Sequence, residues 1–295
     1  MKKTPSPYLA IFIAVLAAAS SAIFIKLAGA PPLVAAFYRL FFTLLILTGP
    51  LVFGGLGELK VMSRRDLFLA GLAGIFLALH FAVWFTSLEY TTVSSSTVLV
   101  TLQPLFVIGG GYWLYREKVG IRALAGALLA IGGSILVGYG DFAVGGRALW
   151  GDFLALAGAL FIAVYVLIGR GLRQRLSLLP YVYVVYGVAA LVLLLTNWLA
   201  FGQPLTGYVA ATWGWFVALA LIPTILGHTL FNWALRHVPA AVVSVSILGE
   251  PVGATVLAYL IWQQVPGPVQ LAGSLAILVG LAVFISSVER SRQQG

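Results

Sequence analysis

The segment AAVVSVSILGEPVGATVLAYLIW, residues 240–262, is long enough to cross the hydrocarbon core of a membrane, which takes about 20 apolar residues. Its middle contains one acidic residue, Glu250, which is followed by Pro251. A charged side chain at that depth costs about 2.5 kcal/mol or more unless it faces protein, water or a partner. Pro251 also frees a backbone carbonyl one turn earlier, which a membrane helix tolerates only beside a neighbour or a cavity. The segment therefore predicts a membrane span that faces a polar interior.

The composition of the whole chain is that of a polytopic membrane protein. Of its 295 residues, 61% are hydrophobic and only 8% are charged, which is unlike a soluble domain. Apolar segments of spanning length number ten, and the loops between them are short and mostly punctuated by glycine and proline. The sequence predicts an all-α protein whose spans cover about residues 8–27, 33–53, 67–87, 93–115, 122–140, 150–169, 180–201, 213–233, 240–262 and 269–287.

The basic residues predict how these spans are oriented. Fourteen of the 17 lysines and arginines lie in the N-terminus, the even-numbered loops or the C-terminal tail, whereas Arg147 is the clear exception. Because positively charged loops stay in the cytoplasm, we expect both chain ends on the cytoplasmic side. Lys2 and Lys3 before an apolar stretch could also indicate a signal peptide. Treating the first span as a signal peptide would leave nine spans and contradict the charge count, so we favour ten.

The two halves of the chain resemble each other when the sequence is shifted by 147 positions. Pro104 then falls on Pro251 and Tyr112 on Tyr259, while Gly126 and Gly133 fall on Gly273 and Gly280. Each half has five spans, an odd number, so the second half must cross the membrane upside down relative to the first. We therefore expect two inverted five-helix repeats, residues 1–142 and 143–295. Inverted repeats of this kind are typical of secondary transporters, whose substrate site lies near the midplane.

These features resemble the EamA-type branch of the drug/metabolite transporter superfamily. The resemblance covers nearly the whole chain and depends on the five-plus-five duplication, the Leu102-Gln103-Pro104 and Leu248-Gly249-Glu250-Pro251 elements, and the glycine stretches that follow. It implies a ten-helix carrier with a central cavity that exports or exchanges small metabolites, with amino acids or related compounds favoured. We accordingly expect a bacterial or archaeal plasma (inner) membrane protein.

Members of that family tend to carry a Gly-Glu pair just after spans four and nine. This chain instead has Arg116-Glu117 in the first half and Gln263-Gln264 in the second. The departure weakens the case for a role at those loop positions.

The predicted substrate site begins with the polar residues of spans four and nine. Glu250 could titrate protons, pair with a substrate ammonium group, or cap backbone donors of a broken helix. Ser246 shares its helix face, and Pro104 and Pro251 mark where the two helices break. Gln103 is the repeat mate of Glu250, so the fold by itself does not require a carboxylate.

Span three places His80 and Trp84 four residues apart, on one helix face. An imidazole and an indole could bind an amino compound by stacking and hydrogen bonding. The alternative is that Trp84 anchors its helix at the membrane interface. We expect both residues to line the substrate path.

Two further groups complete the predicted site. In span eight, Thr224, His228 and Asn232 recur every four residues and form a polar ribbon, which we expect to face the interior and either to contact substrate or water or to make hydrogen bonds between helices. Because His228 and Asn232 lie toward the cytoplasmic end, we expect them at an inner gate rather than at the central site. Tyr38 and Arg39 lie in the outer half of span two. Arg39 could attract a substrate carboxylate, pair with an acidic group such as Glu89, or extend to the outer headgroups.

The sequence offers little support for other classes of protein. It has no cysteine, its three histidines are scattered, and no hydrolase, zinc-protease or phosphate-loop motif occurs, so we expect neither an enzyme nor a cofactor or metal site. Its basic residues sit in membrane loops, which argues against nucleic-acid binding. We expect a small-molecule substrate, contact with lipid, and a monomer or homodimer working by alternating access. The alternatives are a scaffold or receptor, or a carrier of drug cations or nucleotide-like metabolites.

Overall fold

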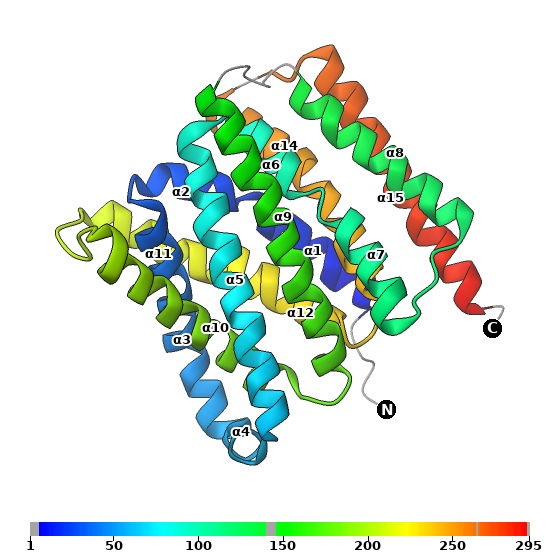
Figure 1. Ribbon diagram of the computed structural model, residues 1–295. Helices are drawn as coiled ribbons and strands as arrows, with labels where there is room; N and C mark the ends of the chain where they lie inside the picture. The colour runs from blue at the N-terminus through cyan, green and yellow to red at the C-terminus, as the bar shows by residue number, and fades with distance from the viewer. Residues whose placement is uncertain (1–5, 140–145, 264, 294–295) are drawn as a thin grey trace.

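The computed structural model describes residues 6–139, 146–263 and 265–293. Every regular element in these ranges is a helix (Figure 1). The first half contains α1 (Pro7–Ala19), α2 (Ser21–Ala28), α3 (Pro32–Gly54), α4 (Leu56–Val61), α5 (Arg64–Tyr90), α6 (Val93–Val100), α7 (Pro104–Tyr115) and α8 (Ile121–Gly138).

The second half repeats this order with more interruptions. It contains α9 (Gly146–Arg173), α10 (Leu178–Thr196), η2 (Asn197–Phe201), α11 (Ala210–Leu219), η3 (Ala220–Thr229), α12 (Leu230–Ala234), α13 (Ala240–Ser246), η4 (Ile247–Gly249), α14 (Glu250–Trp262) and α15 (Pro268–Gln293). Together the described residues form ten helices long and apolar enough to span a membrane, which confirms the predicted spans to within a few residues. Lys2, Lys3, Asp141, Gln264 and the boundary between residues 142 and 143 lie outside the described residues.

Spans four and nine are broken at repeat-related positions. Span four is interrupted between α6 and α7, where Pro104 begins α7, and span nine is interrupted at η4, where Pro251 follows the first residue of α14. Proline has no backbone N–H and is tolerated at a helix start, which explains why both new helices begin beside one. Each break leaves backbone groups and polar side chains at mid-depth, facing the centre of the bundle.

The glycine stretches form the contact between α8 and α15. A Cβ atom placed on Gly126 would lie 2.7 Å from the carbonyl oxygen of Gly280, and one on Gly133 would lie 2.6 Å from that of Gly273. The two helices therefore approach backbone to backbone, as small residues allow in membranes. This pair lies along one edge of the molecule (Figure 1). These glycines form the packing seam between α8 and α15.

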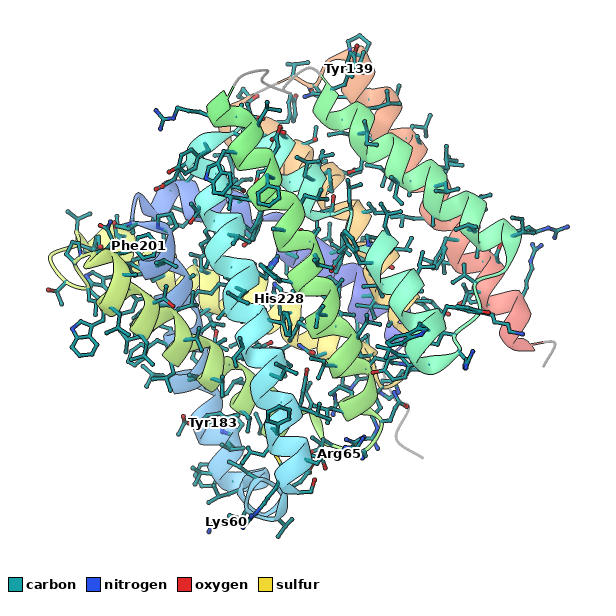
Figure 2. The ribbon with its side chains drawn as sticks, viewed as in Figure 1. Lys60, Arg65, Tyr139, Tyr183, Phe201 and His228 are labelled. Atoms are coloured by element: carbon teal, nitrogen blue, oxygen red, sulfur yellow. The ribbon has the colours of Figure 1, made fainter. Side chains whose placement is uncertain are left out.

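The first span packs in the middle of the bundle. Helix α1 contacts η3, α12, α13 and α14, and both Ala14 and Ala18 are buried. Lys60 and Arg65 lie at the end of the molecule that carries α4, Tyr139 lies at the opposite end, and His228 lies between them (Figure 2). The centre of the bundle thus brings together α1, the breaks of spans four and nine, and the interrupted span eight.

Candidate functional site

A small cavity of about 50 Å³ lies where these elements meet. Seven of the twelve residues that the sequence predicts for binding or gating line it: Arg39, His80, Trp84, Gln103, His228, Asn232 and Glu250. They come from both halves of the chain. A volume of this size has room for only a few water molecules.

Arg39 is fully buried beside this cavity. Its Nε donates to Thr224 Oγ1 at 2.7 Å, and its Nη1 donates to Ser21 Oγ at 2.9 Å. The guanidinium carbon also lies 4.4 Å from the centre of the Phe81 ring, where the ring face attracts a cation. The structure therefore contradicts two of the sequence-based alternatives, because Arg39 neither pairs with Glu89 nor reaches the outer headgroups.

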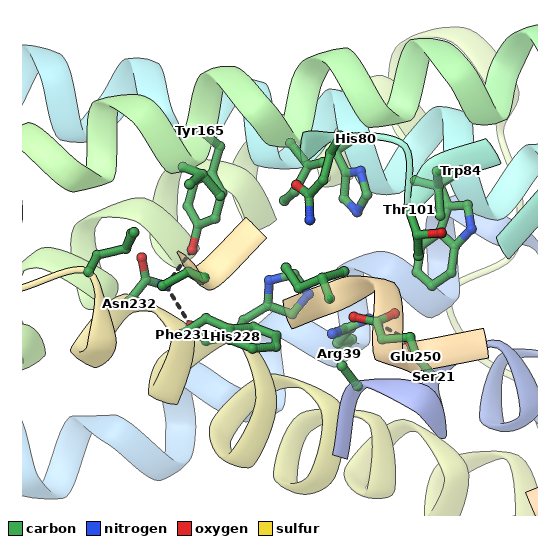
Figure 3. Close-up of a pocket in the computed structure, with 18 residues that line it drawn as sticks. Ser21, Arg39, His80, Trp84, Thr101, Tyr165, His228, Phe231, Asn232 and Glu250 are labelled. Atoms are coloured by element: carbon green, nitrogen blue, oxygen red, sulfur yellow. Dashed lines mark hydrogen bonds between the residues drawn. The ribbon is translucent and has the colours of Figure 1, made fainter. Parts of the chain in front are cut away.

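Glu250 is half-buried at the start of α14 and faces Arg39 (Figure 3). The two opposite charges interact electrostatically across the cavity. The direct ion pairs among the described residues are elsewhere, between Arg170 and Glu117 and between Arg175 and Asp66. Within the described part of the chain, no backbone N–H donates to the Glu250 carboxylate, so the structure does not support the interpretation that it caps the broken helix.

His80 and Trp84 present one stacked surface to the cavity. Their rings lie 5.6 Å apart at an interplanar angle of 20°. His80 Nδ1 lies 2.9 Å from the carbonyl oxygen of Gly158. Because a carbonyl oxygen only accepts, Nδ1 carries a proton and Nε2 is left for the cavity. Trp84 is only 5% exposed, so the alternative that it anchors the helix at the membrane interface is wrong.

Four buried polar atoms of the lining have no hydrogen-bond partner among the described residues. Two are donors, Arg39 Nη2 and Trp84 Nε1, and two are acceptors, Gln103 Oε1 and Asn232 Oδ1. A buried polar atom without a partner costs about 1–3 kcal/mol. All four residues line the same cavity as Glu250, which gives it polar groups that lack a protein partner.

The polar ribbon of span eight divides in an unexpected way. His228 and Asn232 line the central cavity rather than an inner gate below it. The middle of span eight is the π-helical segment η3, which contains Pro223, and Thr224 of the same segment faces Arg39 beside the cavity. Asn232 Nδ2 donates to the hydroxyl of Tyr165 and to the carbonyl oxygen of His228 (Figure 3).

Five predicted residues lie outside the cavity lining. Thr224 contacts the lining residue Arg39, from which its hydroxyl accepts a hydrogen bond, but does not line the cavity itself. The same hydroxyl donates to the carbonyl oxygen of Leu219. Tyr38 donates to the carbonyl oxygen of Leu205, and its ring stacks on that of Phe216 with 4.9 Å between the ring centres, within an aromatic cluster. The remaining three are Ser246, which donates to the carbonyl oxygen of Val242, and the helix-starting Pro104 and Pro251.

Sequence reasoning missed several lining residues. Ser21, Thr101 and Tyr165 all face the cavity, and Ser21 anchors Arg39. Other hydroxyl residues lie near two of them, Ser20 beside Ser21 and Thr97 before Thr101, so no distinctive spacing marks the residues that face the cavity. A stronger signal was available at Thr101, which lies only two residues before Gln103 at the break of span four.

Larger cavities open on the side away from the chain ends. One of about 350 Å³, here called the vestibule, lies between α2, α6 and α14 and is lined by Lys26, Thr97, Pro251, Thr255 and Gln270 among others. On α2, α6 and α14, the residues that line the vestibule are close neighbours in sequence of residues that line the central cavity. A second cavity of about 970 Å³ shares Lys26 with it. Lys26 itself donates to the carbonyl oxygen of Leu88 at 2.6 Å.

Comparison with known proteins agrees with this architecture. The chain matches the EamA-like transporter family over residues 5–139 and 149–286. An uncharacterized transporter of Archaeoglobus fulgidus is 24% identical over 276 residues, covering 93% of this chain and 94% of that one. A pseudopaline exporter of Pseudomonas aeruginosa (strain UCBPP-PA14) is 24% identical over 218 residues, covering 74% and 75%.

A solved crystal structure superposes with a TM-score of 0.79 at 21% identity, over 96% of this chain and 98% of the other. At that identity the likeness shows the fold alone. The family match extends over both halves of the chain and agrees with the ten spans and the repeat-related helix breaks. This multi-pass membrane protein is therefore a transporter that belongs to the EamA-like transporter family.

Proposed function

We propose that this transporter carries small zwitterionic metabolites, amino acids or related compounds, by alternating access. The observation that carries the proposal is the pair of opposite charges at the central cavity, Arg39 and Glu250. Arg39 Nη2 is a free donor for a substrate carboxylate. The Glu250 carboxylate accepts no described hydrogen bond and is suited to an ammonium group.

The charge balance favours a zwitterion over the alternative substrate classes. A drug cation would pair with Glu250 but leave Arg39 without an anion, and a nucleotide-like anion would do the reverse. Burying either charge without a partner is costly. One carboxylate and one ammonium group on the same small molecule satisfy both. The stacked rings of His80 and Trp84 would then contact its side chain.

The shape of the bundle supports alternation. At about 50 Å³ the central cavity is far smaller than the roughly 300–1,000 Å³ of ordinary ligand pockets, so helices must separate to admit a substrate. Helices α6 and α14 enclose the vestibule on one side, whereas their repeat mates α13 and α7 pack together on the other. In an inverted repeat, exchanging these two arrangements opens the opposite side.

The direction and location of transport follow from the basic loops and from one relative. The positive-inside pattern assigns the side of the chain ends to the cytoplasm, so the vestibule would face outward. The Pseudomonas relative is an exporter by name, which supports export across the plasma membrane. The central cavity is complete within one chain, which supports the monomer as the transporting unit.

Counter-flow into liposomes tests the proposal. Purified protein should exchange labelled amino acids saturably, and analogues that lack either the amino or the carboxyl group should fail to compete. Glu250→Gln keeps the size of the side chain but removes its charge. We expect it to raise the half-saturating concentration about tenfold or more, because a hydrogen bond to a charged group is worth about 1.5–3 kcal/mol.

Glu289→Gln is the matched control, since Glu289 lies near the end of α15 and outside the cavity lining. It should exchange substrate like the parent protein. Equal half-saturating concentrations for the parent and Glu250→Gln would remove Glu250 from the site. Exchange of cations or anions without any exchange of zwitterions would overturn the substrate class.

A further inference from the structure

The two repeats differ in how the repeat-related helices α6 and α13 are capped. Thr92 caps α6 locally, since its side-chain oxygen accepts from the backbone N–H of Ser95 at 3.0 Å. The repeat mate of Thr92 is Pro239, which has no side-chain acceptor. Helix α13 therefore cannot cap itself in the same way, although its first N–H groups need acceptors.

The acceptor comes from the other half of the chain. Glu117, just beyond α7, accepts from the backbone N–H of Ala240 through Oε2 at 3.1 Å. Its Oε1 accepts from Arg170 Nε of α9 at 2.7 Å. One carboxylate of the first half thus holds two helices of the second half, at a helix N-terminus where a negative charge is favourable.

Arg170 extends this arrangement to the connection that precedes α13. Its Nη1 donates to the carbonyl oxygen of Leu235 at 2.7 Å, and Gln174 Nε2 donates to the same oxygen at 3.0 Å. We call Glu117, Arg170 and their contacts at Leu235 and Ala240 the clasp. It lies across α7, α9 and α13, on the side of the central cavity opposite to the vestibule.

We infer that Glu117 holds the inner gate closed, where the inner gate is the contact between α7 and α13. Access to the central cavity from the side of the chain ends requires α13 to separate from α7, and Glu117 is attached to both. Separation would leave the N–H of Ala240 without this acceptor, and Arg170 could no longer contact both Glu117 and the carbonyl oxygen of Leu235. Opening the gate therefore removes the carboxylate that caps the start of span nine, which couples gate opening to the segment that leads to Glu250.

The absence of native cysteine allows a direct test. Val243→Cys places a thiol on α13 at the central cavity, and Ala254→Cys places one in the vestibule. Each is reacted with a membrane-impermeant maleimide added to one side of oriented vesicles. In Glu117→Gln we expect labelling of Val243→Cys from the side of the chain ends to rise about tenfold, and labelling of Ala254→Cys from the other side to fall.

Asp66→Asn is the matched control, because it removes the other ion pair of the described chain, to Arg175, without touching α13. Labelling should then match the parent at both thiols. Arg170→Gln provides a second variant that breaks the clasp and should change labelling in the same direction as Glu117→Gln. The melting profile in detergent shows whether each variant is folded. If one of the two is unfolded, the other is used for the labelling test.

Two results would overturn the assignment: unchanged labelling of Val243→Cys in a folded clasp variant, or increased labelling of both thiols, which would mean that the bundle has merely loosened. This inference rests on the proposed alternating access, because a gate is needed only in that mechanism. The labelling experiment, however, requires no substrate. Failure of the clasp and failure of zwitterion transport are therefore separate outcomes.

Discussion

Arg116 and Gln263 are the two non-glycine residues of the described chain that have positive φ, each at 55°. They are repeat mates and end α7 and α14 in the left-handed conformation. After α7, the N–H of Arg116 donates to the carbonyl oxygen of Tyr112 and that of Glu117 to Gly111, which closes the helix end. The departure from the family's Gly-Glu pair is therefore at position 116, where a non-glycine residue adopts the unfavourable left-handed conformation. The glutamate of the pair, Glu117, is present. The departure weakens the case for a role at this loop position, but Glu117 still contacts Arg170 and the backbone N–H of Ala240.

A glycine at position 116 should stabilise the protein. The left-handed conformation costs an ordinary residue about 1–2 kcal/mol, and part of that gain is offset by the greater freedom of glycine in the unfolded chain. We expect Arg116→Gly to raise the free energy of unfolding by about 0.5–1 kcal/mol, measured as a rise in melting temperature in detergent. Lys118→Gly, two residues further on at negative φ, should lower it. A lower melting temperature for Arg116→Gly would contradict this account.

At the scale of elements, the crossing of α8 and α15 depends on the absence of side chains. Gly133→Ala would place a Cβ 2.6 Å from the carbonyl oxygen of Gly273 and 2.7 Å from the nitrogen of Ile277. Neither backbone atom can move without shifting a helix, so we expect a loss of about 1–3 kcal/mol in stability. The melting temperature and the yield of folded protein measure it.

The adjacent glycine supplies the control for this element. A Cβ on Gly132 would meet nothing within 4 Å, so Gly132→Ala should be neutral or stabilise the helix by up to about 1 kcal/mol. Equal effects of the two alanines would show that helix propensity, rather than the contact between α8 and α15, determines the result.

At the scale of the whole molecule, the inverted repeat requires both chain ends to lie on the same side of the membrane. We expect a thiol introduced as Lys118→Cys to react only from the cytoplasmic side, and one introduced as Arg147→Cys only from outside, because the positive-inside pattern orients the protein that way. Impermeant thiol reagents on intact cells and on inside-out vesicles measure this. Reaction of both thiols from the same side would contradict the inverted arrangement.

The sequence by itself determined the ten spans, the two repeats and the polarity of the interior. These properties follow from segment length, from the shift of 147 positions and from the cost of placing Glu250, Gln103 or His80 in lipid. It also identified most of the polar lining, because a buried charge in an apolar helix has few physical explanations.

Only the tertiary structure decided which of these residues meet. Arg39 could be assigned to the cavity only once Ser21 and Thr224, from two other helices, were placed around it. The sequence predicts His228 toward the cytoplasmic end of span eight, and only the packing of η3 against the other helices places it at the central cavity. The role of Glu117 depends on a backbone N–H that is 123 residues away in the chain, a contact that no local pattern encodes.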